Sequence, residues 1–248
     1  MLRSYALTDI GRRRQLNQDF IYCSETPVGN LPNVFIVADG MGGHNAGDYA
    51  SVLAVETVVE EIGTSFEKSP VKVLEHAITK ANTILRQRAS ENFSLSGMGT
   101  TLVAATCIGR YLEVANVGDS RLYVIGDEIT QITEDHSLVE EMVRMGGIDR
   151  EEARNHPDKN IITRAVGARD DVEIDFFNLE LQTGDMVLLC SDGLTNMVDD
   201  EMIRRILKNG GSLKDRVEEL VETANRNGGK DNISVIVIEP LTDEVEHD

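Results

Sequence analysis

Residues 101–125, TLVAATCIGRYLEVANVGDSRLYVI, contain short apolar segments joined by brief connections. The segments Thr101–Cys107, Tyr111–Val117 and Arg121–Ile125 are rich in β-branched residues and predict strands. Consecutive strands with such hairpin-like connections pair antiparallel, because a parallel pair needs a long crossover between its strands. This stretch therefore predicts an antiparallel sheet.

The elements expected outside this stretch do not alternate as βαβ units do. Apolar residues at helical spacing predict two consecutive long helices, one from Val52 to Ile62 and one from Leu74 to Ile84. The missing alternation favours a layered α+β sandwich over a doubly wound parallel sheet. Further strands are expected at Phe20–Cys23, Val34–Ala38, Val172–Leu181, Met186–Cys190 and Ile233–Ile238, and further helices at Ser137–Met145 and Leu213–Ala224.

The composition is that of one globular domain. The chain has 248 residues, of which 41% are hydrophobic, and no repeat or Pro/Ser-rich linker divides it. We therefore predict a single domain over residues 1–240. Residues 136–167 carry no strand signal and are expected to form a surface insertion, and residues 241–248 form an acidic tail.

Charge and cysteine usage limit the compartment and the partners. The chain has 24 basic and 43 acidic residues, a net charge of −19, which repels nucleic acid and anionic lipid. Cys23, Cys107 and Cys190 are widely spaced, which is typical of free thiols in a reducing cytosol. Apolar runs reach only about six residues, and roughly 20 are needed to span a bilayer. We expect a cytoplasmic protein that binds no nucleic acid and does not insert into membranes.

Aspartates stand at the ends of several apolar segments. Asp39, Asp119 and Asp192 come within two residues after a predicted strand, and Asp231 precedes one by two residues. A carboxylate at the end of a buried strand loses hydration and needs a cation or a hydrogen-bonding partner. Any single Asp-Gly pair is also ordinary turn chemistry. Four such sites, most of them without a neighbouring lysine or arginine, favour a shared positive partner.

Oxygen donors alone favour a hard cation as that partner. No histidine or cysteine stands at ligand spacing within the set, so Mg²⁺ or Mn²⁺ is expected rather than zinc. More than two carboxylates could hold two ions roughly 3.5–4 Å apart, which is the arrangement used for in-line phosphoryl displacement. The residue types therefore predict a divalent-metal site suited to phosphate chemistry.

An arginine cluster near the N-terminus could bind the phosphate. Arg12, Arg13 and Arg14 precede Asn17, Gln18 and a further acidic candidate, Asp19. A guanidinium can hold two phosphate oxygens at once, which a lysine cannot. The alternative is a solvated basic turn, but three arginines in so acidic a chain favour anion capture.

These residues occur in motifs that resemble the PPM, or type-2C, family of metal-dependent serine/threonine protein phosphatases, and especially its compact bacterial members. The resemblance covers about residues 3 to 239, and its specificity lies in the order and spacing of the motifs rather than in any one of them. The matching stretches are Arg14 with Asn17-Gln18-Asp19, Val37 to Gly43, Gly97 to Leu102, Asn116 to Arg121, Ser191 to Leu194, and Gly229 to Ser234.

The resemblance implies a four-layer αββα sandwich, in which two antiparallel sheets are flanked by helices and residues 136–167 form a flap. It implies that Asp39 bridges two Mg²⁺ or Mn²⁺ ions, that the Gly40 carbonyl completes one shell, and that Asp192 and Asp231 bind the other ion. By the same likeness, Asp119 with Asp192 would hold a third, weaker ion, Asp19 would support the pair through water, and Arg14 would clamp the phosphate.

Three positions depart from the pattern of other members. Gln18 replaces a common glutamate, and Asn196 stands where some eukaryotic members have another acidic metal ligand. Met41 replaces a histidine proposed as general acid, and methionine cannot donate a proton. His44 could take that role or be an ordinary loop residue, and the leaving-group proton could instead come from metal-bound water.

The implied activity is hydrolysis of phosphoserine and phosphothreonine in proteins by a water or hydroxide that bridges the two metals, with Arg14 neutralising the phosphate. The expected enzyme is a monomer that acts in signalling and reverses a cognate bacterial serine/threonine kinase. Two rival functions remain: a phosphomonoesterase for small molecules, and a catalytically weak module that binds metal and phosphopeptides.

Overall fold

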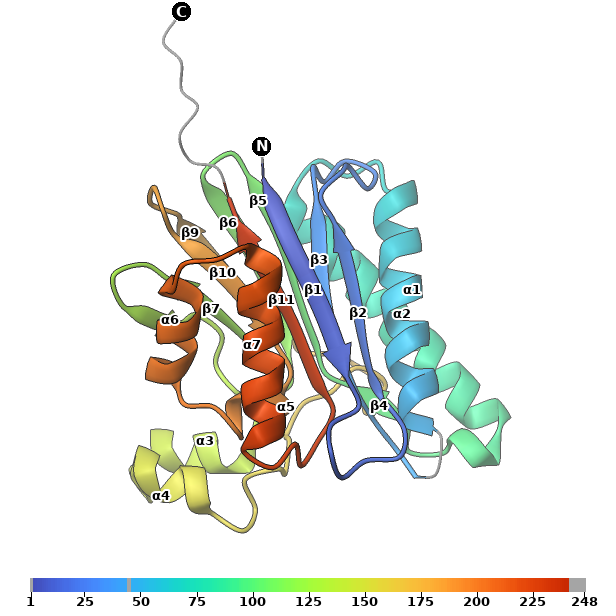
Figure 1. Ribbon diagram of the computed structural model, residues 1–248. Helices are drawn as coiled ribbons and strands as arrows, with labels where there is room; N and C mark the ends of the chain where they lie inside the picture. The colour runs from blue at the N-terminus through green and yellow to red at the C-terminus, as the bar shows by residue number, and fades with distance from the viewer. Residues whose placement is uncertain (1, 44–45, 241–248) are drawn as a thin grey trace, which may run out of the picture.

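The computed structural model describes residues 2–43 and 46–240 and has four layers (Figure 1). Two antiparallel sheets pack face to face, and helices cover the outer face of each sheet. This architecture confirms the predicted αββα sandwich. The predicted tail at 241–248 and His44 lie outside the described residues.

All strand pairs within the sheets are antiparallel. The first sheet has the order β1-β11-β10-β7-β8, with strands at Arg3–Asp9, Ile233–Glu239, Met186–Cys190, Arg121–Ile125 and Ile129–Gln131. The second has the order β2-β3-β5-β6-β9, with strands at Asp19–Ser24, Val34–Met41, Leu102–Ile108, Tyr111–Val117 and Asp175–Glu180, and the short β4 (Gly99–Thr100) pairs with β3.

The helices fall into three groups. The two long helices α1 and α2 cover the second sheet, α5 to α7 cover the first sheet, and α3 and α4 lie beyond one end of the sandwich (Figure 1). Their bounds are Ala46–Thr64, Pro70–Glu91, Leu138–Arg144, Arg150–Asn155, Asp192–Thr195, Asp200–Lys208 and Leu213–Arg226 for α1 to α7, and a 3₁₀ turn, η1, spans Phe93–Leu95.

Three layers of core hold the sandwich together. In β3, Phe35 and Val37 enter the layer between the sheets, whereas Ile36 and Ala38 pack under α1 and α2. Successive strand residues point to opposite faces, so a strand buried on both faces must be apolar throughout. The continuous run before Asp39 therefore reflects burial on both sides, and it ends where the sandwich ends.

The structure corrects the predicted elements at several places. The strand expected at Val172–Leu181 begins only at Asp175. β1 was not predicted, because its burial is only partial; it gains its partner from the far end of the chain, β11. Helix α6 was also missed, although Asp199 caps it and Ile203 and Leu207 are buried at helical spacing.

Candidate metal and phosphate site

Five predicted site aspartates meet at one end of the sandwich, where the β1–β2 loop, β4 and α5 lie together (Figure 1). Asp19 opens β2 and Asp39 lies near the end of β3, and the two residues are directly opposite each other in the strand pairing. Asp192 is the first residue of α5, and Asp231 immediately precedes Asn232 and β11. Asp119 lies in the turn between β6 and β7.

The pKa of Asp39 reflects the charges of the other four carboxyl groups. This pKa is raised well above the ordinary aspartate value, first by burial and then by the charges of Asp19, Asp192, Asp119 and Asp231. Like charges this close disfavour ionisation, whereas a divalent cation would reverse the effect. The site therefore favours uptake of positive charge.

The other aspartates respond to the same environment. Burial raises the pKa of Asp19 to about 7, with smaller contributions from the charges of Asp192 and Asp231 and opposition from its hydrogen bonds to Ser191 and Ser234. Burial also raises the pKa of Asp192 to about 6, and the charge of Asp231 adds to this shift. The pKa of Asp119 is raised as well, mainly by burial.

Two carboxylate oxygens in the site are buried and lack a hydrogen-bond partner among the described residues: Oδ1 of Asp19 and Oδ1 of Asp192. In each residue the other oxygen is occupied, since Ser191 Oγ donates to Asp19 Oδ2 at 2.7 Å and Asn196 Nδ2 donates to Asp192 Oδ2 at 2.8 Å. Buried, unpartnered carboxylate oxygens are costly unless they bind a cation. An all-oxygen donor set of this kind suits Mg²⁺ or Mn²⁺.

Hydroxyl groups and close backbone packing fix the end of β3. The Asp39 amide donates to Thr101 Oγ1 at 2.9 Å, and Thr101 Oγ1 is 2.7 Å from Ser120 Oγ. The next amide, of Gly40, donates to the Gln18 carbonyl at 3.0 Å. A Cβ at Gly40 would collide with the Gly47 carbonyl oxygen of helix α1. Glycine is therefore required at position 40 for α1 to approach the strand.

Arg14 lies at the same site. Its Nη2 donates to Asp231 Oδ2 at 2.7 Å, and its side chain is 48% exposed. The arginine and the carboxylate thus neutralise each other in this state. No group of three or more His, Cys, Asp or Glu side chains within residues 2–43 and 46–240 is preset as a metal-ligand cluster. In this state Asp19, Asp192 and Asp231 each have one carboxylate oxygen hydrogen-bonded to a neighbouring side chain.

Sequence reasoning assigned no role to Ser191 and Ser234, which support Asp19. The Ser234 amide donates to Ser191 Oγ at 3.0 Å, and Ser234 Oγ is 2.8 Å from Thr8 Oγ1. Ser191 in turn donates to Asp19, so one chain of hydrogen bonds joins the two sheets beneath the carboxylates. Both serines belong to the motifs quoted above, so the sequence marked them as candidates. Only the fold shows that the two serines lie beside each other and beside Asp19.

The segment 136–167 is tied to the turn that carries Asp119. Nδ1 of the buried His136 accepts the Gly118 amide at 3.0 Å, and its Nε2 is 2.9 Å from Asp175 Oδ2. Arg164 donates to Asp175 Oδ1 at 2.9 Å. Both ends of the insertion therefore anchor next to the site, and α3 and α4 project from this base (Figure 1).

Comparison with known proteins agrees with this geometry. The model of the family described as protein phosphatase 2C matches residues 10–236, which include all five aspartates and Arg14. The chain belongs to the protein phosphatase 2C family. The predicted family is thereby confirmed.

Individual members of the protein phosphatase 2C family match over nearly their full length. The serine/threonine phosphatase stp of Listeria innocua is 43% identical over 245 residues, covering 94% of this chain and 93% of the relative. The structure of the Streptococcus agalactiae serine/threonine phosphatase is 37% identical, with a TM-score of 0.89 and coverage of 96% and 99%. The catalytic domain of PstP in complex with two manganese ions is 34% identical, with a TM-score of 0.85 and coverage of 97% and 98%.

None of the helices in the described parts of this phosphatase-family chain has the length and apolar character needed to cross a bilayer.

Proposed function

We propose that the protein is a serine/threonine protein phosphatase that requires Mn²⁺ or Mg²⁺ and hydrolyses phosphoserine and phosphothreonine in proteins. The observation that carries the proposal is the meeting of five aspartates, drawn from β2, β3, α5 and two loops, at one end of the sandwich. The named activity of the Listeria and Streptococcus relatives and the two manganese ions in the PstP complex support it.

The residues take the following roles in this proposal. Asp39 and the Gly40 carbonyl would hold one ion, and Asp39, Asp192 and Asp231 would hold the other. Asp19 would support the pair, and Asp119 with Asp192 would hold a third, weaker ion. When bound, Mn²⁺ or Mg²⁺ supplies Lewis acidity toward phosphate oxygens and makes water an effective nucleophile near neutral pH.

Arg14 binds the phosphate group of the substrate. Its guanidinium donates to Asp231 in the described state, so the same group is already held at the edge of the carboxylate cluster. Binding of a cation by Asp231 would free the guanidinium, which could then donate to two phosphate oxygens. Asp231 would then bind a metal ion in place of Arg14, and Arg14 would bind the substrate phosphate in place of Asp231.

The segment 136–167 is the flap of this enzyme, within a single catalytic domain that spans residues 1–240. It projects from the end of the sandwich where the site lies (Figure 1), and a flap beside the site favours a phosphorylated protein over a small ester. We place the enzyme in the cytoplasm as a monomer, where it opposes a cognate serine/threonine kinase.

The proposal is tested by phosphate release from a phosphothreonine peptide by metal-stripped protein. Activity should appear with Mn²⁺ or Mg²⁺, disappear with excess EDTA, and fall at least ~10³-fold in Asp39→Asn, since the substitution removes the bridging carboxylate. The matched control is Asp127→Asn, which removes an equal charge from an exposed turn between β7 and β8 and should retain full activity.

Other outcomes separate the rival functions. Full activity in excess EDTA would overturn the metal-dependent mechanism. Turnover of small phosphate esters without turnover of any phosphopeptide would favour a small-molecule phosphomonoesterase. Binding of the phosphopeptide without turnover under either metal would favour the binding module.

A further inference from the structure

We propose that Lys159, in the segment between α4 and β9, is a positioning residue that orients the Asp192 carboxylate through the side chain of Asn196. The inference rests on the proposed metal-dependent function and adds a residue that controls one of its ligands. It also gives Asn196 a role that an acidic residue at that position could not fill.

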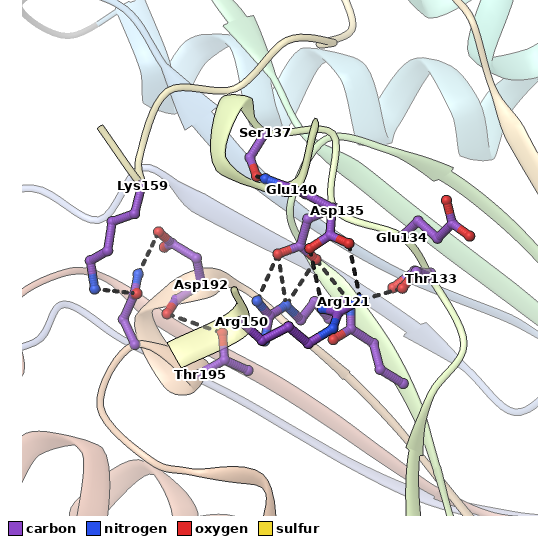
Figure 2. A network of polar contacts seen from close by, with 12 residues as sticks. Arg121, Thr133, Glu134, Asp135, Ser137, Glu140, Arg150, Lys159, Asp192 and Thr195 are labelled. Carbon is purple, nitrogen blue, oxygen red and sulfur yellow. Dashed lines mark hydrogen bonds and ion pairs between the residues drawn. The ribbon is translucent and has the colours of Figure 1, made fainter. Parts of the chain in front are cut away.

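Three side chains form a continuous line of hydrogen bonds. Lys159 Nζ donates to Asn196 Oδ1 at 2.9 Å, and Asn196 Nδ2 donates to Asp192 Oδ2 at 2.8 Å. Figure 2 shows the two outer side chains of this line, Lys159 and Asp192. The line therefore runs from the flap segment to a proposed metal ligand.

The chemistry of the two outer groups selects one orientation of the amide. An ammonium can only donate hydrogen bonds and a carboxylate can only accept them, whereas the Asn196 amide has one end of each kind. Turning the amide over would place its oxygen against Asp192 and its NH₂ against Lys159, so both contacts would become repulsive. Without the lysine, only the contact with Asp192 would oppose rotation of the Asn196 amide.

The fixed amide determines which oxygen of Asp192 remains available. Asn196 occupies Oδ2, while Oδ1 is buried and has no partner among the described residues. A backbone hydrogen bond strengthens the arrangement, because the main-chain N–H of Asn196 donates to the main-chain carbonyl of Asp192 at 2.8 Å. Asp192 is thus held with one oxygen saturated and the other free for a cation.

Lys159 also connects this ligand to the flap. Its own amide donates to the His156 carbonyl at 3.3 Å, which ties it to the residue that follows α4. A flap that moves away would remove the lysine from Asn196 and release the amide. The hydrogen bond from Lys159 to Asn196 therefore links the position of the flap to the orientation of Asp192.

The sign of the effect distinguishes positioning from simple electrostatics. Removing a positive charge near a cation site strengthens cation binding if long-range Coulomb forces dominate. Loss of positioning weakens it instead, and substitution of residues that orient metal ligands typically costs about 10–100-fold in metal affinity. Lys159→Met removes the charge and the donor while keeping a long side chain, so it separates the two cases.

The experiment is calorimetric titration of metal-stripped protein with Mn²⁺. Lys159→Met should raise the Kd about 10-fold at one class of sites, Lys159→Arg should restore most of the affinity because it keeps a donor, and Lys159→Met in an Asn196→Ala background should add nothing. Arg150→Met is the matched control, since it removes a flap cation that pairs with Glu140 at 3.1 Å and not with Asn196 (Figure 2).

Several results would overturn the positioning role. These are an unchanged or lower Kd in Lys159→Met, an equal rise in Arg150→Met, or additive effects of the Lys159 and Asn196 substitutions. Failure of the proposed function has a different signature, because the wild-type protein would then bind no Mn²⁺ or would bind it unchanged after Asp39→Asn.

Discussion

Asp39→Asn should stabilise the metal-free protein although it abolishes function. Asp39 and Asp19 are directly opposite in the β2–β3 pairing, which places their Cβ atoms about 5 Å apart. At an effective dielectric constant of about 20, two full charges at that separation repel by about 3 kcal/mol. Both groups relieve part of this repulsion by taking up protons, so we expect a gain of about 2 kcal/mol at neutral pH.

Thermal unfolding in excess EDTA at pH 7.5 measures this gain. For a chain of this size about 1 kcal/mol corresponds to roughly 2–4 °C, so the melting temperature of Asp39→Asn should rise by about 4–8 °C. The exposed-charge control Asp127→Asn should stay within about 0.5 kcal/mol of the wild type. Saturating Mn²⁺ should reverse the order, because it stabilises only a protein that binds it.

The pH dependence has a defined sign. Burial raises the pKa of Asp19 to about 7 in the folded state, whereas an unfolded aspartate titrates near pH 4. Between these values the folded state holds more protons than the unfolded state, so the stability of the metal-free protein falls as pH rises through this window. The advantage of Asp39→Asn should therefore shrink at pH 5. An unchanged or lower melting temperature of Asp39→Asn at pH 7.5, or an advantage that grows at pH 5, would show that the charge of Asp39 does not destabilise the metal-free protein.

Two further substitutions test the phosphate clamp and the helix approach. Arg14→Ala should raise KM for a phosphothreonine peptide about 10-fold or more, because a charge-assisted contact to phosphate is lost. Substitution of the exposed neighbour, Arg13→Ala, should leave KM nearly unchanged. Equal KM values for the two variants would contradict the role of Arg14 in binding phosphate. Gly40→Ala should yield little folded protein, since its Cβ would meet the Gly47 carbonyl of α1. Wild-type expression and melting temperature would contradict the close packing. The control is Gly43→Ala, where a Cβ meets nothing within 4 Å.

The sequence was sufficient to predict the sandwich because both faces of its central strands are buried. A run such as Val34–Ala38 with no polar residue has to lie between two apolar layers, and the abrupt change to Asp39 marks the edge of those layers. Elements with weaker burial escaped prediction: β1 has mostly half-buried residues, and its pairing with β11 depends on contact across nearly the whole chain.

The same contrast holds at the site. The aspartates were predictable because a carboxylate at a strand end needs compensation, whereas their support depends on distances that spacing does not reveal. Ser191 reaches Asp19 across 172 positions, and Lys159 reaches Asn196 across 37. The direction of an amide or hydroxyl depends on which donors and acceptors the fold places beside it, so the contact between Lys159 and Asn196 could not be predicted from the sequence.

We propose that the carboxylates at the end of the sandwich hold divalent cations. Anomalous X-ray scattering at the manganese edge, from crystals grown with Mn²⁺, measures this directly. We expect at least two anomalous peaks, one bonded to Asp39 and the Gly40 carbonyl and one bonded to Asp39, Asp192 and Asp231. Fully occupied manganese elsewhere on the protein, with none among these groups, would contradict it.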